Sequence, residues 1–125
     1  MLVLKWNLNR LYAGHLIASS VVDIYSSSTG IWTTARLSSS RWALASASVS
    51  ALGLALFAGG MTSDLVASDT IDIYNGVSNR WTADHLSVAR YRLSAAAISV
   101  PSQNFDYFAL FAGGFLDGMF SPSTL

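Results

Sequence analysis

The chain has 125 residues, no cysteine, 7 basic and 7 acidic side chains, and an apolar fraction of 52%. Balanced charge argues against an electrostatic nucleic-acid binder, and the apolar content excludes an intrinsically disordered chain. Without cysteine there is no disulfide framework, thiolate metal site or cysteine nucleophile.

The predicted elements are organised by an apolar segment that recurs along the chain. Residues 54–60 (LALFAGG) return as ALFAGG at 109–114, and residues 11–14 (LYAG) are a weaker third copy. A second motif, VDIY at 22–25, returns as IDIY at 71–74, which is 49 positions later. Recurrence at a period of this size is the signature of a tandem-repeat fold.

The spacing between copies changes at one place. The offset of 49 maps Trp32 onto Trp81 and Arg41 onto Arg90, whereas the two Gly-Gly pairs are 54 positions apart. The extra residues are expected around 101–105 (PSQNF), a composition typical of a loop.

Within one unit the pattern predicts four β-strands. The first, about 42–49, alternates Ala and Ser, and its counterpart is 93–100. The second, 52–58, is apolar almost throughout, as expected of an inner strand. The third, 70–74, places Asp72 on the face opposite its isoleucines, and the fourth is short, about 80–83.

The turn between the third and fourth strands carries a conformational signal. Residues 25–32 and 74–81 have the same length, with Gly30 and Asn79 in the same position. Glycine and asparagine are the residues that most readily enter the left-handed region, so both turns are predicted to close with a positive φ.

The ordered set of residues resembles the kelch repeat: an apolar strand ending in Gly-Gly, a variable loop, a Tyr, a Trp seven residues later, and an Arg opening the next unit. The resemblance covers nearly all of residues 3–118. It departs from the pattern at His15, which stands where a second Gly is expected. The matching positions are Gly59, Gly60, Gly113, Gly114, Tyr25, Tyr74, Trp32, Trp81, Arg41 and Arg90.

The resemblance implies an all-β fold of kelch-type β-propeller blades, each a four-stranded antiparallel sheet. Residues 1–125 would then form about two and a half blades of an incomplete propeller. Strands two to four of one blade fall at 3–40, a complete blade at 41–89, and strands one and two of the next at 90–120. Because propellers need about four to eight blades, we expect a fragment of a longer protein or, if the chain is complete, a homo-oligomer.

Candidate chemistry is sparse, and no catalytic or metal-binding residue is predicted. Asp23 and Asp72 repeat with the blade, which favours a structural hydrogen bond or ion pair. Arg41, Arg90 and Arg92 are expected to pair between blades rather than bind anions. Variable loops on a repeated scaffold commonly carry specificity, so the candidate loop-binding residues are Asp64, Asp69, Arg36 and His85.

The leading hypothesis is a protein-interaction scaffold that contacts a protein partner through the loops after strands two and four. The alternative is a fragment of a carbohydrate-active or oxidative kelch-propeller enzyme with its catalytic residues on other blades. Copper radical oxidases of this kind need a Tyr cross-linked to a Cys, which this segment lacks. No cofactor, nucleic acid or membrane is expected, and the lack of a signal or apolar span favours the cytoplasm.

Overall fold

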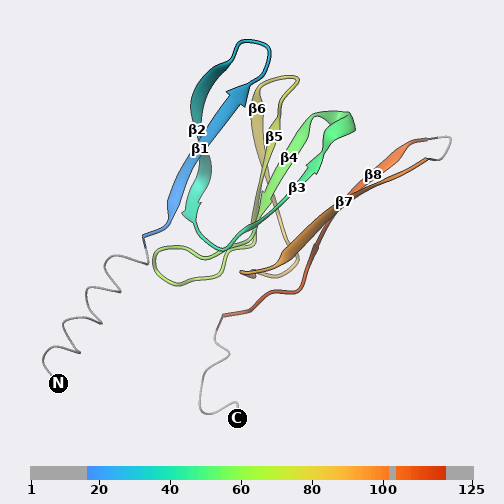
Figure 1. The fold of residues 1–125 in the computed structure, drawn as a ribbon. Helices are drawn as coiled ribbons and strands as arrows, with labels where there is room; N and C mark the ends of the chain where they lie inside the picture. Colours follow the sequence, from blue (N-terminus) through green and yellow to red (C-terminus); the bar gives the residue numbers. More distant parts are fainter. Residues whose placement is uncertain (1–16, 102–103, 118–125) are drawn as a thin grey trace, which may run out of the picture.

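The computed structural model describes residues 17–101 and 104–117. This part of the chain is all-β and forms three small antiparallel sheets (Figure 1). The weak third copy of the repeat at 11–14 and His15 lie outside the described residues. The strands are β1 (Ser19–Ser26), β2 (Ile31–Arg41), β3 (Ala45–Val49), β4 (Leu54–Ala58), β5 (Thr70–Asn75), β6 (Arg80–His85), β7 (Ser94–Val100) and β8 (Asp106–Ala112), with a 3-10 turn, η1 (Ser50–Leu52), between β3 and β4.

The middle sheet confirms the predicted four-stranded unit. Its order, β3-β4-β5-β6, is the order of the strands in the chain, because each connection joins neighbouring antiparallel strands. The register places Ala58 opposite Ile71 and Tyr74 opposite Trp81. Alternation in β5 therefore puts Asp72 and Tyr74 on one face and the two isoleucines on the other.

The other two sheets are hairpins that correspond to opposite halves of this unit. β1-β2 matches the third and fourth strands, and β7-β8 matches the first and second. Arg41 was predicted to open the middle unit, but it is the last residue of β2 and pairs with Ser19. The strand reaches this point across an irregularity in the ladder, since Val21 pairs with Arg36 and Ser19 with Arg41.

The repeat extends to unusual backbone conformations. Gly30 and Asn79 have φ of 69° and 55°, which confirms the predicted left-handed turn closures. Ala43 and Arg92, also 49 positions apart, both have φ of 54°. This second pair could not be predicted from the residue types, because neither alanine nor arginine favours positive φ.

The extra residues of the last hairpin were expected around 101–105, and residues 101–105 are the segment between β7 and β8, as predicted. β7 and β8 have 7 residues each, whereas β3 and β4 have 5 each. Residues 50–53, which include η1, therefore correspond to paired strand residues in this hairpin. The result is a long hairpin that stands away from the middle sheet (Figure 1).

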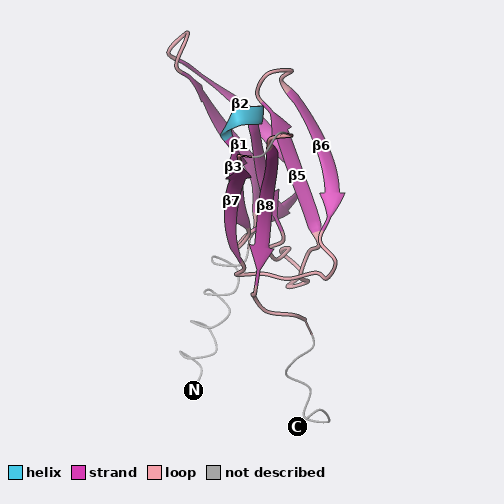
Figure 2. Cartoon of the chain, turned by 90° about the vertical axis from the view of Figure 1, so that its right-hand side faces the viewer, coloured by secondary structure: helices cyan, strands magenta, loops and turns pink. Residues whose placement is uncertain are grey.

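The core is small and lies where the sheets meet. β3 packs against both β7 and β8. The strands lie roughly side by side in the view of Figure 2, and Figure 1 shows that the three sheets fan apart toward their hairpin turns. Ala58, at the end of β4, is completely buried, with 0% of its surface exposed. The buried apolar residues are Ala18, Ala45, Val49, Ala58, Met61, Ala67 and Leu93.

Candidate functional site

The most buried charged pair of the described residues joins two sheets. Arg41, at the end of β2, forms an ion pair with Asp72 in β5. The same guanidinium donates hydrogen bonds to the carbonyl oxygens of Gly59 at 2.7 Å and Thr70 at 2.8 Å. The other oxygen of Asp72 accepts the backbone N–H of Ser38 in β2 at 3.2 Å. The prediction of a structural ion pair is thus confirmed for Arg41 and Asp72.

Burial governs the ionisation of this arginine. Desolvation lowers the pKa of Arg41 from its usual value, and the charge and hydrogen bond of Asp72 oppose that shift. The guanidinium remains a cation at neutral pH because arginine titrates far above it. The pair is therefore a structural junction between sheets rather than a proton donor or acceptor.

Arg90 makes part of the same arrangement one repeat later. It donates a hydrogen bond to the carbonyl oxygen of Gly113 at 2.9 Å, as Arg41 does to Gly59. Its second terminal nitrogen lies 3.4 Å from the carbonyl oxygen of Phe111. Among the described residues Arg90 has no ion pair. The contact between the arginine and the glycine carbonyl is therefore repeated, whereas the ion pair with an aspartate is not.

The Gly-Gly pair after β4 is required by close backbone contacts. A Cβ on Gly59 would lie 2.5 Å from the carbonyl oxygen of Arg90, and one on Gly60 would lie 2.7 Å from that of Trp42. Both glycines have positive φ, 69° and 98°. Only glycine combines this conformation with such close approach.

The Tyr and Trp of each unit form a cross-strand pair. The ring centroids of Tyr25 and Trp32 are 5.2 Å apart, and those of Tyr74 and Trp81 are 5.0 Å apart. Trp81 also packs against Phe57 of β4, with centroids 6.1 Å apart. Both pairs, and the contact of Trp81 with Phe57, lie within a single sheet. Trp32 has no third aromatic neighbour among the described residues, and 66% of its surface is exposed.

The loops after β4 and β6 lie together at one end of the middle sheet. Gly60 donates to the carbonyl oxygen of Arg90 at 2.9 Å, and Arg90 donates to that of Ser68 at 3.1 Å. We define the loop-end surface as Asp64, Leu65, Val66 and Asp69 of the loop after β4, Val88 of the loop after β6, and the neighbouring His85.

Two of the predicted site residues meet on this surface. His85 Nδ1 lies 3.1 Å from Asp69 Oδ1, and both side chains are largely exposed. His85 was expected in a loop, but it is the last residue of β6, because its backbone still pairs with Thr70. Asp64 lies in the loop after β4, as predicted.

Arg36 is the repeat counterpart of His85, and it too lies in a strand rather than a loop. It is paired with Val21 across β1-β2, where the antiparallel ladder continues past the predicted strand end. Its guanidinium donates to the hydroxyl of Ser20 at 3.2 Å. Ser20 is the counterpart of Asp69, so both units carry a polar cross-strand contact at this position. Arg36 therefore belongs to the first hairpin and not to the loop-end surface.

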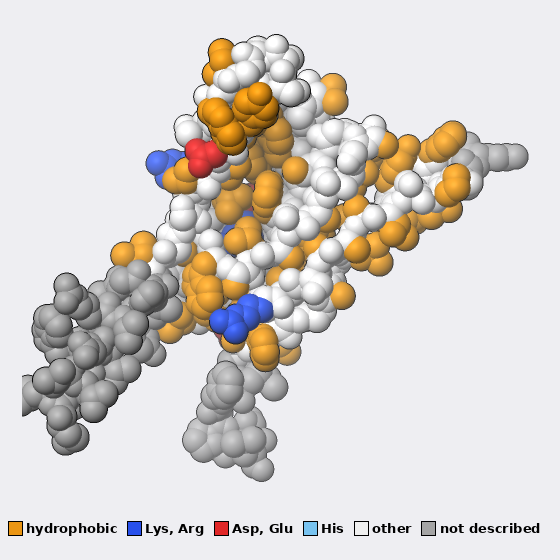
Figure 3. Space-filling model, in the orientation of Figure 1, with side chains coloured by type: hydrophobic (Ala, Val, Ile, Leu, Met, Phe, Trp, Pro, Cys, Tyr) orange, Lys and Arg blue, Asp and Glu red, His pale blue; other side chains and the backbone are white. Residues whose placement is uncertain are grey.

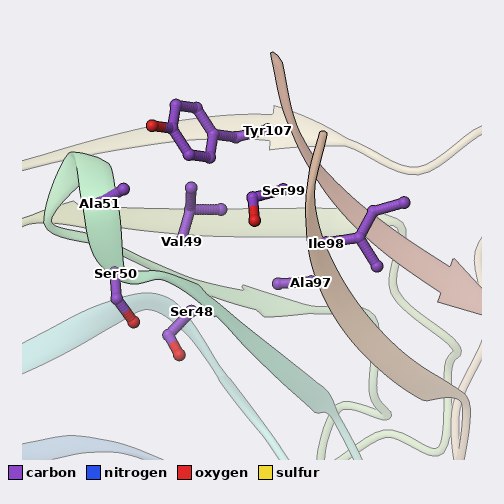
Figure 4. A pocket seen from close by; sticks show the side chains of 8 residues that line it. All are labelled: Ser48, Val49, Ser50, Ala51, Ala97, Ile98, Ser99 and Tyr107. Atoms are coloured by element: carbon purple, nitrogen blue, oxygen red, sulfur yellow. The ribbon is translucent and has the colours of Figure 1, made fainter. Parts of the chain in front are cut away.

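A groove that was not predicted from the sequence lies at the end of the sheets opposite the loop-end surface. It has a volume of about 300 Å³ and lies between β3-η1 and the β7-β8 hairpin (Figure 4). It is lined by residues 48–51, 97–99 and Tyr107, whose polar side chains are hydroxyls. Its walls come from two different repeats, and their small residues carry no recognisable motif. The groove offers hydrogen bonding but no charged group.

Searches against protein-family models and against curated proteins find no match to this chain. Within residues 17–101 and 104–117 no three His, Cys, Asp or Glu side chains are grouped as a metal site would require. In the same part of the chain, no helix has the length and apolar character needed to span a membrane.

Proposed function

We propose that the chain is part of a kelch-type β-propeller and serves as a protein-interaction scaffold. The sheet order β3-β4-β5-β6 supports the blade assignment, together with the repeated arginine-to-glycine contact and the repeated Tyr–Trp pair. The arginine-to-glycine contact and the Tyr–Trp pair each occur twice in the chain, at the positions that carry the resemblance.

The observation that carries the interaction role is the composition of the loop-end surface. Val66 and Val88 are 52% and 50% exposed, and Leu65 is 41% exposed. Asp64 and the Asp69–His85 pair lie in or beside the same loops. Apolar side chains with a polar surround are what a protein–protein interface presents.

The scaffold beneath these loops is held in place by backbone hydrogen bonds. Besides the contacts of Arg90, Leu86 donates to the carbonyl oxygen of Asp69 at 2.6 Å. The loop after β4 is closed by a bond from Thr62 to the carbonyl oxygen of Val66 at 2.9 Å. A surface fixed in this way loses little conformational entropy when a partner binds.

The test compares cross-linked partners of matched variants in extracts of the source cells, quantified by mass spectrometry. Val66→Asp places a charge in the loop-end surface. Val77→Asp places the same charge at the opposite end of the sheet, at a residue that is 84% exposed. A protein captured by the parent chain and by Val77→Asp, but lost from Val66→Asp, supports the proposal. Identical partners for both variants, with both folded, contradict it.

A further inference from the structure

The β7-β8 hairpin is exposed in the way expected of a sheet that lacks its third and fourth strands. Ala112 in β8 is the counterpart of Ala58 and is exposed, whereas Ala58 is fully buried. Phe108 and Leu110 are each 47% exposed. Hydrophobic side chains gather along this hairpin in the space-filling view (Figure 3). Among the described residues, β8 pairs only with β7, so its outer edge is open.

The contacts of Arg90 indicate which charge belongs at that edge. Arg41 contacts Gly59, which directly follows β4, and Asp72 in β5, the strand that pairs with β4. Arg90 makes the glycine contact at Gly113 but has no acid within the described residues. The missing partner of β8 should therefore carry an aspartate opposite Phe111, because Asp72 lies opposite Phe57.

The described chain contains a strand with this property. In β1, residues 22–25 (VDIY) are the counterpart of IDIY in β5, and Asp23 occupies the position of Asp72. Asp23 is exposed and makes no ion pair or side-chain hydrogen bond with the described residues. β1 pairs only with β2 in the same part of the chain. Arg90 and Asp23 have opposite charges, and each lies beside an open edge.

We propose that the β1-β2 hairpin of a second copy of this chain pairs with β8. The composite sheet, β7-β8 followed by β1-β2 of the second copy, repeats the order β3-β4-β5-β6. Transferring the register of the middle sheet places Ala112 opposite Val22 and Phe111 opposite Asp23 of the second copy. Arg90 then pairs with that Asp23 as Arg41 pairs with Asp72.

The second Gly-Gly pair fits the same arrangement. A Cβ on Gly113 would meet no atom within 4 Å, although Gly113 has a φ of 72°. At Gly59 the equivalent space is occupied by the carbonyl of Arg90, which also accepts the N–H of Gly60. Arg41 is the counterpart of Arg90 by the offset of 49. In the composite sheet the carbonyl of Arg41 of the second copy fills this space and accepts the N–H of Gly114.

Residues 11–14 of the same chain are the competing occupant of the β1 edge, since the repeat aligns them with the second strand. That copy carries His15 at the position of Gly60. A Cβ at Gly60 would approach Trp42 O to 2.7 Å, and one at Gly114 would approach Tyr91 O to 2.6 Å. A second copy supplies an intact Gly-Gly pair at this point, which favours it as the partner.

Pairing of this kind is head-to-tail, and it forms a ring when the rotation from copy to copy closes on itself. The described residues of each copy contribute one four-stranded sheet and two half-sheets, which is equivalent to two blades. Because propellers close with about four to eight blades, rings of two to four copies are expected. The inference does not depend on the proposed partner of the loop-end surface, and failure of either leaves the other standing.

The test exchanges the two charges in the full chain and measures solution mass by light scattering. We expect the parent chain at two to four times 13.3 kDa. Arg90→Asp and Asp23→Arg should each shift the chain to the monomer mass, and the double variant should restore the parent mass. Since the double variant restores the charge pair, its recovery separates a lost contact from simple misfolding.

Arg80→Asp and Asp84→Arg are the matched controls, because they make the same charge changes at exposed positions of β6. Both should keep the parent mass. A monomeric parent chain overturns the proposal, as does an oligomer whose mass is unchanged in both single charge variants. A double variant that is folded by circular dichroism yet monomeric also overturns it.

Discussion

Arg41 and Asp72 form a buried ion pair that ties the end of β2 to the third strand of the neighbouring sheet. Arg41 is 2% exposed and Asp72 is 3% exposed. The carbonyl oxygens of Gly59 and Thr70 accept the other hydrogen bonds of the guanidinium. Loss of one member leaves the other charge buried without a counter-ion, so this pair is the first target for mutation.

Arg41→Met is expected to lower the free energy of unfolding by about 3–5 kcal/mol, because it leaves the Asp72 carboxylate buried and unpaired. Urea denaturation followed by circular dichroism measures the change. Arg80→Met removes an exposed arginine from β6 and should change stability by less than about 0.5 kcal/mol. Equal effects of the two substitutions would contradict a structural role for the buried pair.

Gly60→Ala should destabilise the chain more than Gly30→Ala. Both glycines have positive φ, so each substitution costs about 1–2 kcal/mol of backbone strain. A Cβ on Gly30 meets no atom within 4 Å, whereas one on Gly60 lies 2.7 Å from the carbonyl oxygen of Trp42. The additional loss of stability in Gly60→Ala, measured from the urea denaturation midpoints, reports the contact with the carbonyl oxygen of Trp42. Two variants of equal stability would argue against it.

Trp81→Ala should cost more stability than Trp32→Ala, although the two residues occupy the same repeat position. Trp81 is half-buried between Tyr74 and Phe57, and its loss should cost about 3 kcal/mol. Trp32 is 66% exposed and contacts one aromatic ring, so about 1 kcal/mol is expected. Both losses of stability are measured by urea denaturation in chains that also carry Arg90→Asp, because we expect this change to keep the chain monomeric. A reversed order would be incompatible with the described packing.

Gly113→Ala should disrupt the oligomer without a matching effect on the single chain. The Cβ has open space in one copy, and φ is similar at Gly113 and Gly30, 72° and 69°. Gly30→Ala is therefore a control for backbone strain alone. Light scattering should find Gly113→Ala at a lower mass than Gly30→Ala. The same mass for both would show that nothing approaches Gly113.

The strands and their repetition could be predicted from sequence because the signals are local. The apolar run of β4, the alternation of β5 and the Gly30 and Asn79 turns each depend on residues adjacent in the chain. The extension of β6 to His85 could not be read in this way. It depends on a backbone partner in β5 rather than on the side chains of residues 84–85.

The candidate site was only partly predictable for the same reason. An ion pair at Asp72 could be expected from its repetition. The hydrogen bonds from Arg41 to the carbonyl oxygens of Gly59 and Thr70 form only because β2 meets the middle sheet. Residues 101–105 were predicted as a loop from their composition, and they lie between β7 and β8. The greater length of β7 and β8 relative to β3 and β4 depends on pairing between the strands, which composition does not show.

The most direct test of the pairing between β8 of one copy and β1 of another is disulfide trapping, because the chain has no cysteine of its own. Cysteines at Ala112 and Val22 should lie opposite each other between copies, as Ala58 and Ile71 do within one. Such facing residues are close enough for a disulfide. On mild oxidation, Ala112→Cys with Val22→Cys should form covalent oligomers on a non-reducing gel.

The control, Ala112→Cys with Val21→Cys, shifts one cysteine by a residue and so to the other face of its strand, and it leaves Asp23 in place. It should stay predominantly uncross-linked. Cross-linking of the first pair alone is the predicted result. No cross-linking of either pair, or equal cross-linking of both, would contradict the pairing of β8 with β1 of a second copy.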